Sequence, residues 1–184
     1  MSMQQDFALS WDRYFLDIAG TVSGKSHCLS KQRGCIIVRG KQILSTGYNG
    51  PPTGFYHCDD IWYRVKISEM FLDCVKLGWD YRPICPRKIM GFEPGKGLEY
   101  CPASHAEDNA IVQAAKNGIS VKGGSLYCSF AEIPCRECVK SIINAGIREI
   151  VLEDVPVDYS ESGIAGKFLL ERCGVKIRGE NDKG

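Results

Sequence analysis

A histidine, a glutamate and two cysteines stand at the spacing of a catalytic zinc site in this chain of 184 residues. A catalytic zinc takes three protein ligands, from nitrogen and thiolate donors, and keeps a fourth position for water. His105, Cys135 and Cys138 supply this set. Glu107, two residues after the histidine, can lie close to the metal without binding it and carry protons to and from the water. Together, the four residues predict hydrolytic chemistry.

Both halves of this candidate site are expected at the start of a helix. Ser104 and Glu107 have the spacing of a capping box, in which two side chains cap the first turn of a helix. Pro134 precedes a run in which Cys135 and Cys138 are one helical turn apart and therefore share a face. A helix N-terminus favours negative charge, which helps to keep two thiols ionised for a metal.

The order His-x-Glu, then Pro-Cys-x-x-Cys, resembles the signature of the zinc-dependent nucleobase deaminases. Either half alone is weak evidence, because a Cys-x-x-Cys pair can also be a redox pair or half of a structural zinc site. The two halves together favour a deaminase. A structural zinc site without catalytic activity is the alternative, and it would leave Glu107 with a capping role only.

The composition indicates a single domain over residues 1–184, with a long insertion at about 60–100. The 23 Lys and Arg residues nearly balance the 22 Asp and Glu residues, so no strong field is expected to attract nucleic acid. Ten cysteines, without a secretory signal or an apolar run of membrane length, indicate a cytoplasmic protein in a reducing compartment, with no membrane partner.

Strand and helix patterns alternate in the second half of the chain, which predicts an α/β fold with a mixed sheet covered on both faces. Residues 39–41 are short enough to join the first two strands as a hairpin. The segment 83–97 is rich in proline and glycine and is expected to form an ordered loop. The expected strands are 34–38, 42–46, 125–129, 149–152 and 175–177, and the expected helices are 10–22, 61–77, 105–118, 135–146 and 164–172.

Further motifs resemble the deoxycytidylate (dCMP) deaminase family in particular. They are Ser-Trp-Asp-x-Tyr-Phe from Ser10, the Lys25-Ser26 pair, and Ser-Thr-Gly-Tyr-Asn-Gly-x-Pro from Ser45. The resemblance implies a three-layer cytidine-deaminase-like fold with a five-stranded sheet. It also implies zinc-dependent hydrolysis of dCMP to dUMP and ammonia, in pyrimidine deoxynucleotide metabolism. Glu107 would pass a proton to N3 of the pyrimidine and then to the leaving amine.

The same resemblance implies a set of nucleotide-binding residues. Asn49 matches an asparagine that holds the nucleotide in the family, and Lys25 and Ser26 match an Arg-Ser pair suited to a 5′-phosphate. Ser104 and Tyr159 complete the expected set. Without the resemblance, Asn49 would be interpreted as a turn residue, Lys25 as a solvated surface lysine and Tyr159 as a half-buried aromatic residue.

A second, structural zinc is implied by family members that hold one with cysteines at similar positions. The matching residues, all in expected loops, are Cys28, Cys58, Cys85 and Cys101. Four thiolates would close the zinc site and fix the long insertion to the rim of the active site. His27 and His57, next to two of these cysteines, are alternative ligands, and free loop thiols without a common partner are the simpler interpretation.

One departure from the family concerns the connection from the third strand to the cysteine pair. Residues 129–133 make it longer than is usual, which would reshape the wall of the base pocket. Another cytosine nucleotide or nucleoside therefore remains the main alternative substrate: dCTP, a modified dCMP or deoxycytidine. A nucleic-acid deaminase is expected to show a basic stripe with interleaved aromatic residues, and none is visible.

Two further properties follow only from the resemblance. Family members are homo-oligomers, commonly hexamers, and the same is expected here. Many are allosteric enzymes that dCTP activates and dTTP inhibits, with Mg²⁺ bound to the triphosphate, and no residues are assigned to such an effector site.

Overall fold

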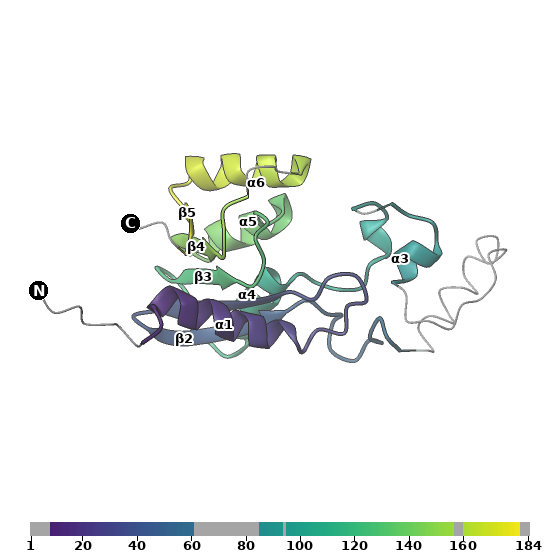
Figure 1. Ribbon diagram of the computed structural model, residues 1–184, viewed down its shortest axis with the longest axis horizontal. Coiled ribbons are helices and arrows are strands. Elements are labelled where there is room, and N and C mark those ends of the chain that lie inside the picture. Colours follow the sequence, from purple (N-terminus) through teal and green to yellow (C-terminus); the bar gives the residue numbers. More distant parts are fainter. Residues whose placement is uncertain (1–7, 61–84, 94, 157–159, 181–184) are drawn as a thin grey trace, which may run out of the picture.

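The computed structural model describes residues 8–60, 85–93, 95–156 and 160–180, and a five-stranded mixed sheet forms its centre (Figure 1). The strand order is β2-β1-β3-β4-β5. β1 runs antiparallel to β2 and β3, whereas β3, β4 and β5 are mutually parallel. The strands are β1 (Gly34–Arg39), β2 (Gln42–Tyr48), β3 (Ser125–Cys128), β4 (Glu149–Leu152) and β5 (Lys176–Gly179).

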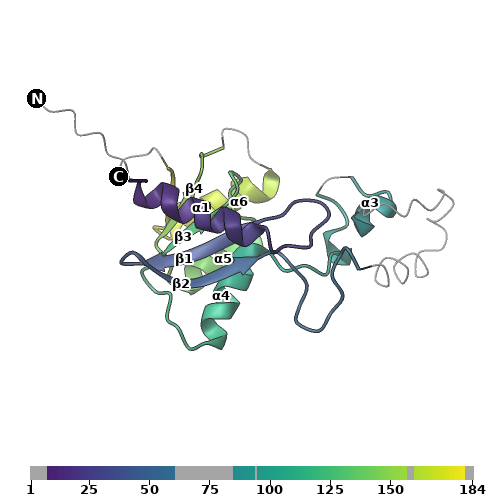
Figure 2. The same cartoon turned by 60° about the horizontal axis from the view of Figure 1, so that its bottom comes forward.

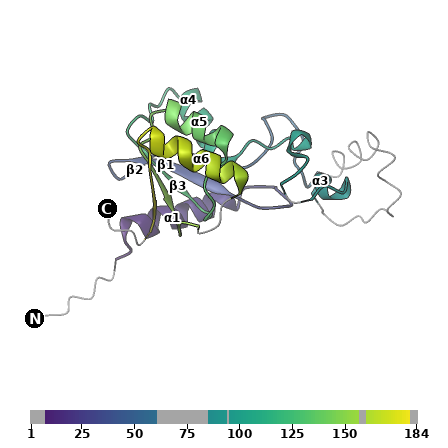
Figure 3. The ribbon, with the colours of Figure 1, turned by 90° about the horizontal axis from the view of Figure 1, so that it is seen from above.

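Helices cover both faces of the sheet, with α1 on one face and α4, α5 and α6 on the other (Figure 3). The described helices are α1 (Trp11–Ser23), α3 (Pro86–Ile89), α4 (Ala106–Lys116), α5 (Arg136–Asn144), α6 (Glu161–Arg172) and the 3₁₀ helix η2 (Leu98–Tyr100). The three-layer fold predicted from the sequence is therefore confirmed.

The core is divided by the sheet, because successive strand residues point to opposite faces. In β1, Ile36 and Val38 pack against α1, while Cys35 and Ile37 pack against α4 and α5. The α1 side consists of Phe15, Leu16, Ala19, Ile36, Val38, Tyr127 and Val151. The first five residues of β1 are buried, as expected for a central strand with helices on both sides.

The hairpin between β1 and β2 forms as predicted. Gly40 has a φ of +57° and Lys41 a φ of +65°. Two successive residues with positive φ are typical of the type I′ turn, whose twist matches that of the strands it joins. Lys41 also places its Nζ 4.7 Å from the centroid of the Trp11 ring, so the turn contacts the start of α1.

The segment before the catalytic histidine differs from its prediction in part. Residues 83–97 were expected to be loop, but Pro86–Ile89 form α3, whose Pro86 suits the first position of a helix. Figures 1 and 2 show α3 beyond the end of the sheet, away from α1 and α6. The expected helix over 61–77 lies outside the described residues. In the described part of the chain, no helix is long and apolar enough to cross a membrane.

Candidate active site

The N-termini of α4 and α5 bring the three predicted zinc ligands together. His105 is the N-cap of α4, Cys135 is the N-cap of α5, and Cys138 lies in the first turn of α5. The Nδ1 of His105 is 3.2 Å from the Sγ of Cys138 and 3.4 Å from the Sγ of Cys135, and the two sulfurs are 3.5 Å apart. The chain therefore gathers one nitrogen and two sulfurs at a single point.

The capping box predicted at this site is wrong. The N-cap of α4 is His105, one residue later than Ser104, and it makes no side-chain capping hydrogen bond. Ser104 instead forms an isolated β-bridge with Gly50, with its N–H donating to the Gly50 carbonyl at 2.9 Å. This bridge holds Ser104 in an extended conformation and delays the helix by one residue. The bridge also links the Tyr48-Asn49-Gly50 loop, by backbone hydrogen bonds, to the segment that carries His105.

Close packing holds α4 against the sheet and the start of α5 against α6. A Cβ on Gly47 of β2 would lie 2.2 Å from the backbone nitrogen of Ala110, so only glycine lets α4 lie this close to the sheet. A Cβ on Gly166 of α6 would lie 2.7 Å from the carbonyl oxygen of Pro134. The hydroxyl of Ser162 accepts a hydrogen bond at 3.1 Å from the backbone N–H of Arg136, which satisfies a free donor of the first turn of α5.

The electrostatics of the three ligands suit a metal that prefers thiolates. Hydrogen bonds from the Cys138 thiol and from His105 lower the pKa of Cys135 to about 4. The pKa of Cys138 is raised, chiefly because its thiol donates to Cys135, and that of His105 is raised chiefly by its hydrogen bond to Cys135. One histidine nitrogen and two cysteine sulfurs, the latter bound as thiolates, are the donor set of a catalytic zinc.

Glu107 lies beside this group but is not part of it. Among the described residues, only the donor atoms of His105, Cys135 and Cys138 form a set of three or more within 4.8 Å of one another. The Glu107 side chain is 3% exposed, and its burial raises the pKa of the carboxyl group. The positive charge of His105 acts in the opposite direction. A carboxyl group in this position can hold and release a proton near the metal site.

The Tyr48-Asn49-Gly50 loop lies against the segment that precedes β1. Asn49 is 7% exposed, and its amide accepts a hydrogen bond from the Arg33 N–H at 2.8 Å and donates one to the Lys31 carbonyl at 2.9 Å. The buried hydroxyl of Ser26 donates to the Asn49 carbonyl at 2.7 Å. Asn49 and Ser26 thus come together at one end of the sheet, and their contact with nucleotide stays a prediction.

Lys25 is exposed and borders a cavity of about 410 Å³. The cavity is lined by Gly24, Lys25, Ser26, His27, Cys28, Leu29, Gln32 and Asp59. None of the three zinc ligands lines it, and neither does Glu107. A phosphate contact for Lys25 also stays a prediction. Tyr159, the remaining expected nucleotide contact, lies outside the described residues.

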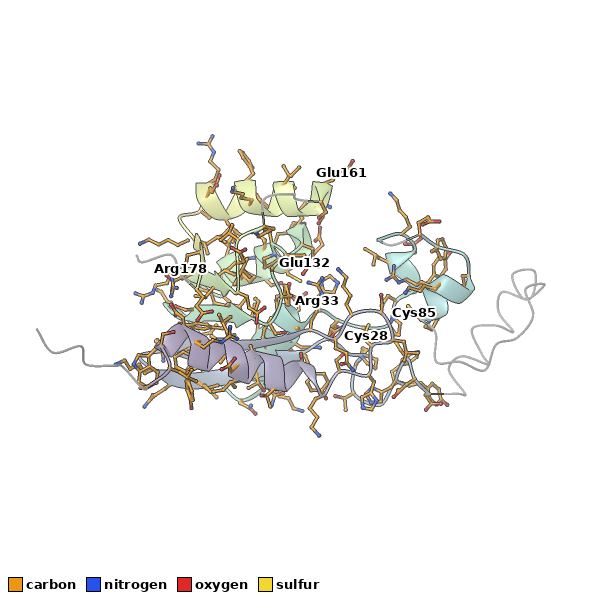
Figure 4. All side chains as sticks on the ribbon, in the orientation of Figure 1. Cys28, Arg33, Cys85, Glu132, Glu161 and Arg178 are labelled. Atoms are coloured by element: carbon orange, nitrogen blue, oxygen red, sulfur yellow. The ribbon has the colours of Figure 1, made fainter. Side chains whose placement is uncertain are left out.

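The four loop cysteines share one region but not one coordination sphere. Burial, with smaller contributions from nearby Cys101, Cys28 and Cys85, raises the pKa of Cys58 to about 12. Figure 4 shows Cys28 and Cys85 on neighbouring loops at the same end of the molecule. No three of the four sulfurs lie within 4.8 Å of one another among the described residues, so they stand further apart than the ligands of one zinc.

Two histidines lie in the same region. The rings of His27 and His57 are 4.4 Å apart between centroids, and the His27 Nδ1 is 2.6 Å from an Asp59 carboxylate oxygen. The Nδ1 of His57 is buried without a hydrogen-bond partner in the described structure. Both histidines therefore lie together, next to two of the four cysteines in sequence.

The sequence did not indicate that Arg33, Phe130 and Glu132 lie together. Arg33 stacks on the Phe130 ring and pairs with the Glu132 carboxylate. The alternation of β1, extended one residue backwards, would have placed Arg33 on the face that carries Cys35, the same face as α4 and α5. Nothing in the local sequence indicates Glu132, which is 99 residues away.

Comparison with known proteins agrees with the geometry. Residues 9–154 match the family described as the cytidine and deoxycytidylate deaminase zinc-binding region. A deoxycytidylate deaminase of enterobacteria phage T2 is 33% identical over 174 residues, covering 88% of each chain. A deoxycytidylate deaminase of Schizosaccharomyces pombe is 30% identical over 172 residues, covering 94% of this chain and 44% of the yeast protein. The chain thus spans under half the length of that relative.

The fold also matches solved structures. The dCMP deaminase of cyanophage S-TIM5, in complex with dCMP and dUMP, superposes with a TM-score of 0.60 at 23% sequence identity. The match covers 97% of this chain and 99% of that one. At this identity the likeness concerns the fold, and it supports the three-layer architecture described above.

Proposed function

The chain belongs to the cytidine and deoxycytidylate deaminase zinc-binding family, and on that basis we propose that it is a zinc-dependent hydrolase that converts dCMP and water to dUMP and ammonia. The observation that carries this proposal is the meeting of His105, Cys135 and Cys138 beside the fully buried carboxyl group of Glu107. The deoxycytidylate deaminases of phage T2 and S. pombe support dCMP as the substrate.

His105, Cys135 and Cys138 would hold the metal at the paired helix starts. When bound, zinc supplies a Lewis acid that makes a nucleophilic water available near neutral pH. The positive ends of two helices face these ligands, which lowers the cost of two thiolates. Cys138 is buried and Cys135 is partly buried, which limits the access of water to the sulfurs.

Glu107 is the proton carrier in this reaction. Its carboxylate takes a proton as water adds to C4 of the pyrimidine and delivers that proton to N3 of the ring. It then takes the remaining proton from the new C4 hydroxyl group and delivers it to the 4-amino group, which leaves as ammonia while C4 becomes a carbonyl. The surrounding apolar residues make this transfer efficient, because they hold the carboxyl pKa above its usual range and so nearer to neutral pH.

Asn49, Lys25, Ser26 and Ser104 are proposed to bind the nucleotide. The Ser26 hydroxyl contacts the Asn49 carbonyl, and the bridge from Gly50 to Ser104 joins the Asn49 loop to the residue before His105. The amide of Asn49 also bonds to the backbone of Lys31 and Arg33, so it shapes this wall as well as offering polar atoms. Tyr159 stays in the proposed set on the family resemblance alone.

A second zinc is proposed for Cys28, Cys58, Cys85 and Cys101. Four thiols are the donor set of a structural zinc site, and two of these four, Cys58 and Cys85, are buried. Their sulfurs would have to move together to about 2.3 Å from one ion. His27 and His57 remain alternative ligands in the same region.

Assembly and regulation are proposed from the family. We expect a homohexamer, and the apolar side chains of Ile164 and Phe168, each 58% exposed on α6, support a contact between subunits there. We also expect activation by dCTP and inhibition by dTTP in the presence of Mg²⁺. Light scattering tests the first expectation, and ammonia release with each triphosphate tests the second.

The decisive experiment for the proposed function is a substrate panel assayed for ammonia. It comprises dCMP, dCTP, 5-methyl-dCMP, deoxycytidine and a cytosine-containing single-stranded DNA, each with the wild-type protein and with Glu107→Gln. Release from dCMP with the highest kcat/KM, lost in Glu107→Gln, supports the proposal. Preference for another member of the panel would reassign the substrate, and no release from any of them would leave a zinc-binding protein without this activity.

A further inference from the structure

Arg33 enters β1 on the face of the sheet that carries the catalytic helices. A Cβ on the next residue, Gly34, would lie 2.2 Å from the carbonyl oxygen of Ala19 in α1, so Gly34 faces α1. Cys35 lies in the opposite core, with Ala106 of α4 and Cys138 of α5. Since extended residues alternate between faces, the Arg33 side chain belongs with Cys35, on the side of α4 and α5.

The guanidinium group of Arg33 is held in place from two directions. Its central carbon lies 4.3 Å from the centroid of the Phe130 ring, and its Nη2 donates to a Glu132 carboxylate oxygen at 2.6 Å. The backbone is fixed too, because the Arg33 N–H donates to the Asn49 side chain at 2.8 Å and the Arg33 carbonyl accepts from the Asn49 N–H at 3.1 Å. Such a preorganised group loses little entropy when it binds a ligand.

The contacts leave part of the guanidinium group for a ligand. Nε and Nη1 of Arg33 have no acceptor among the described residues, and the side chain is 24% exposed. Lys31 places its Nζ 2.7 Å from the same oxygen of Glu132, so two cations share one carboxylate. This cluster of Lys31, Arg33 and Glu132 therefore keeps a net positive charge and is suited to an anion.

Arg33 lies on the side of the sheet where α4 begins with Ala106 and Glu107. Burial raises the pKa of Glu107, and the positive charge of Arg33 is close enough to act in the opposite direction. Arg33 acts in the same way on buried Cys128. Figure 4 shows Arg33 and Glu132 together at the end of the sheet nearest the loops of Cys28 and Cys85. The Arg33 side chain is partly exposed, so a ligand can reach it.

We propose that Arg33 binds the 5′-phosphate of the nucleotide and selects nucleotides over nucleosides, an inference that rests on the proposed deamination of dCMP. The phosphate is the charged group of that substrate, and the planar fork of a guanidinium group binds phosphate with two hydrogen bonds. Phe130 and Glu132, from the lengthened connection 129–133, orient the fork. The connection that departs from the family thereby sets substrate choice.

The test compares ligands with and without phosphate in three variants. Arg33→Met removes the charge, Arg33→Lys keeps the charge but loses the fork, and Arg39→Met is the matched control at the far end of β1, where Arg39 donates to the Ser120 and Lys122 carbonyls. Calorimetry measures the affinity for dUMP and deoxyuridine, and ammonia release measures kcat/KM for dCMP and deoxycytidine. Thermal unfolding checks that each variant is folded.

Loss of one charge-assisted, two-point contact is expected to weaken dUMP binding by about 10- to 100-fold in Arg33→Met, with deoxyuridine unchanged. Arg33→Lys is expected to fall between wild type and Arg33→Met, and Arg39→Met to behave as wild type. If Arg33→Met does not fold, the Arg33→Lys result decides. Equal losses for dUMP and deoxyuridine would overturn the phosphate contact and leave Arg33 as a support of the 129–133 connection.

The binding measurement separates this inference from the proposed function. A wild-type protein that binds dUMP through Arg33 but releases no ammonia from dCMP would contradict the deamination and keep the phosphate contact. A wild-type protein that deaminates dCMP, with both Arg33 variants retaining full preference for dUMP over deoxyuridine, would keep the function and reject Arg33. A wild-type protein without affinity for dUMP would overturn the phosphate contact.

Discussion

Asp12 and Arg178 form a two-point ion pair that joins the first turn of α1 to β5, an edge strand of the sheet. The Arg178 Nη1 and Nη2 donate to the two Asp12 carboxylate oxygens at 2.6 and 2.9 Å. The Tyr127 hydroxyl of β3 donates to Asp12 at 2.9 Å, and the Arg178 Nε donates to Glu149 of β4 at 3.1 Å. One carboxylate therefore connects the N-terminal helix to two strands.

This ion pair predicts how stability depends on pH. The hydrogen bond from Arg178 lowers the pKa of Asp12 below 3.8, so its contribution is complete above the unfolded pKa and is lost as the pH falls through the lower folded pKa. Asp12→Asn is expected to reduce the free energy of unfolding by about 1 to 2 kcal/mol at pH 7. Urea unfolding at pH 7 and at pH 3 measures this, and the deficit is expected to shrink at pH 3.

The control for Asp12 is Asp17→Asn on the same helix. Asp17 is 52% exposed and pairs with Arg13 within α1, so its loss is expected to cost less than about 0.5 kcal/mol. A deficit for Asp12→Asn that stays constant between pH 7 and pH 3, or that equals the deficit of Asp17→Asn, would contradict the interpretation.

Glu107→Gln is expected to lower turnover of dCMP by about 10² to 10⁴, because the amide keeps the shape of the side chain but cannot carry a proton. Zinc content and the unfolding temperature are expected to stay near those of the wild type. Ammonia release measures turnover, metal analysis measures zinc content, and thermal unfolding gives the unfolding temperature. Glu171→Gln, at a residue that is 62% exposed on α6, is the matched control and is expected to remain fully active. Normal turnover in Glu107→Gln would remove this residue from the mechanism.

Gly47→Ala is expected to destabilise the protein and to reduce its activity. The new Cβ would lie 2.2 Å from the Ala110 nitrogen and 2.4 Å from the Ala106 carbonyl oxygen, so α4 and its zinc ligand must move. Overpacking of this kind costs about 1 to 3 kcal/mol. Gly20→Ala in α1 is the opposite case, since a Cβ there meets nothing within 4 Å and alanine favours a helix. Changes of opposite sign in the free energy of unfolding would support the argument, and two similar changes would refute it.

The second zinc predicts two metal ions per chain. Cys85→Ser is expected to release one of them and to leave the Glu107-dependent activity partly intact, because Cys85 lies in a loop apart from the three catalytic ligands. Cys173→Ser, at an exposed free cysteine, is the control and should keep both. Metal analysis of purified protein decides the matter, and one zinc per fully active wild-type chain would reject the second site.

Most of the fold was readable from the sequence because its signals are local. The five expected strands form, with ends shifted by up to two residues, since the buried run of β1 and the Gly40-Lys41 turn are set by neighbouring residues. His105, Cys135 and Cys138 were identifiable for the same reason: each half of the pattern opens a helix. The capping box was wrong because Ser104 pairs with Gly50, a contact between segments far apart in the sequence.

The parts that the sequence could not provide depend on tertiary contacts. The position of the Arg33 side chain depends on its contacts with Phe130 and Glu132. No sequence periodicity connects residues that are 97 and 99 positions apart. The roles of Asn49, Lys25, Ser26 and Tyr159 in nucleotide binding, like the second zinc, stay predictions. Expected homohexamer assembly and cytoplasmic location also stay predictions.

The bridge between Gly50 and Ser104 has a thermodynamic consequence for metal and nucleotide. It joins the loop of Asn49 to the residue before His105. A ligand that orders one of these segments therefore also orders the other. Two ligands that stabilise one arrangement must raise each other's affinity by the same factor. Zinc should therefore bind more tightly in the presence of dUMP, and dUMP should bind more tightly to zinc-loaded protein. Competition with a chelator, with and without dUMP, measures that factor directly.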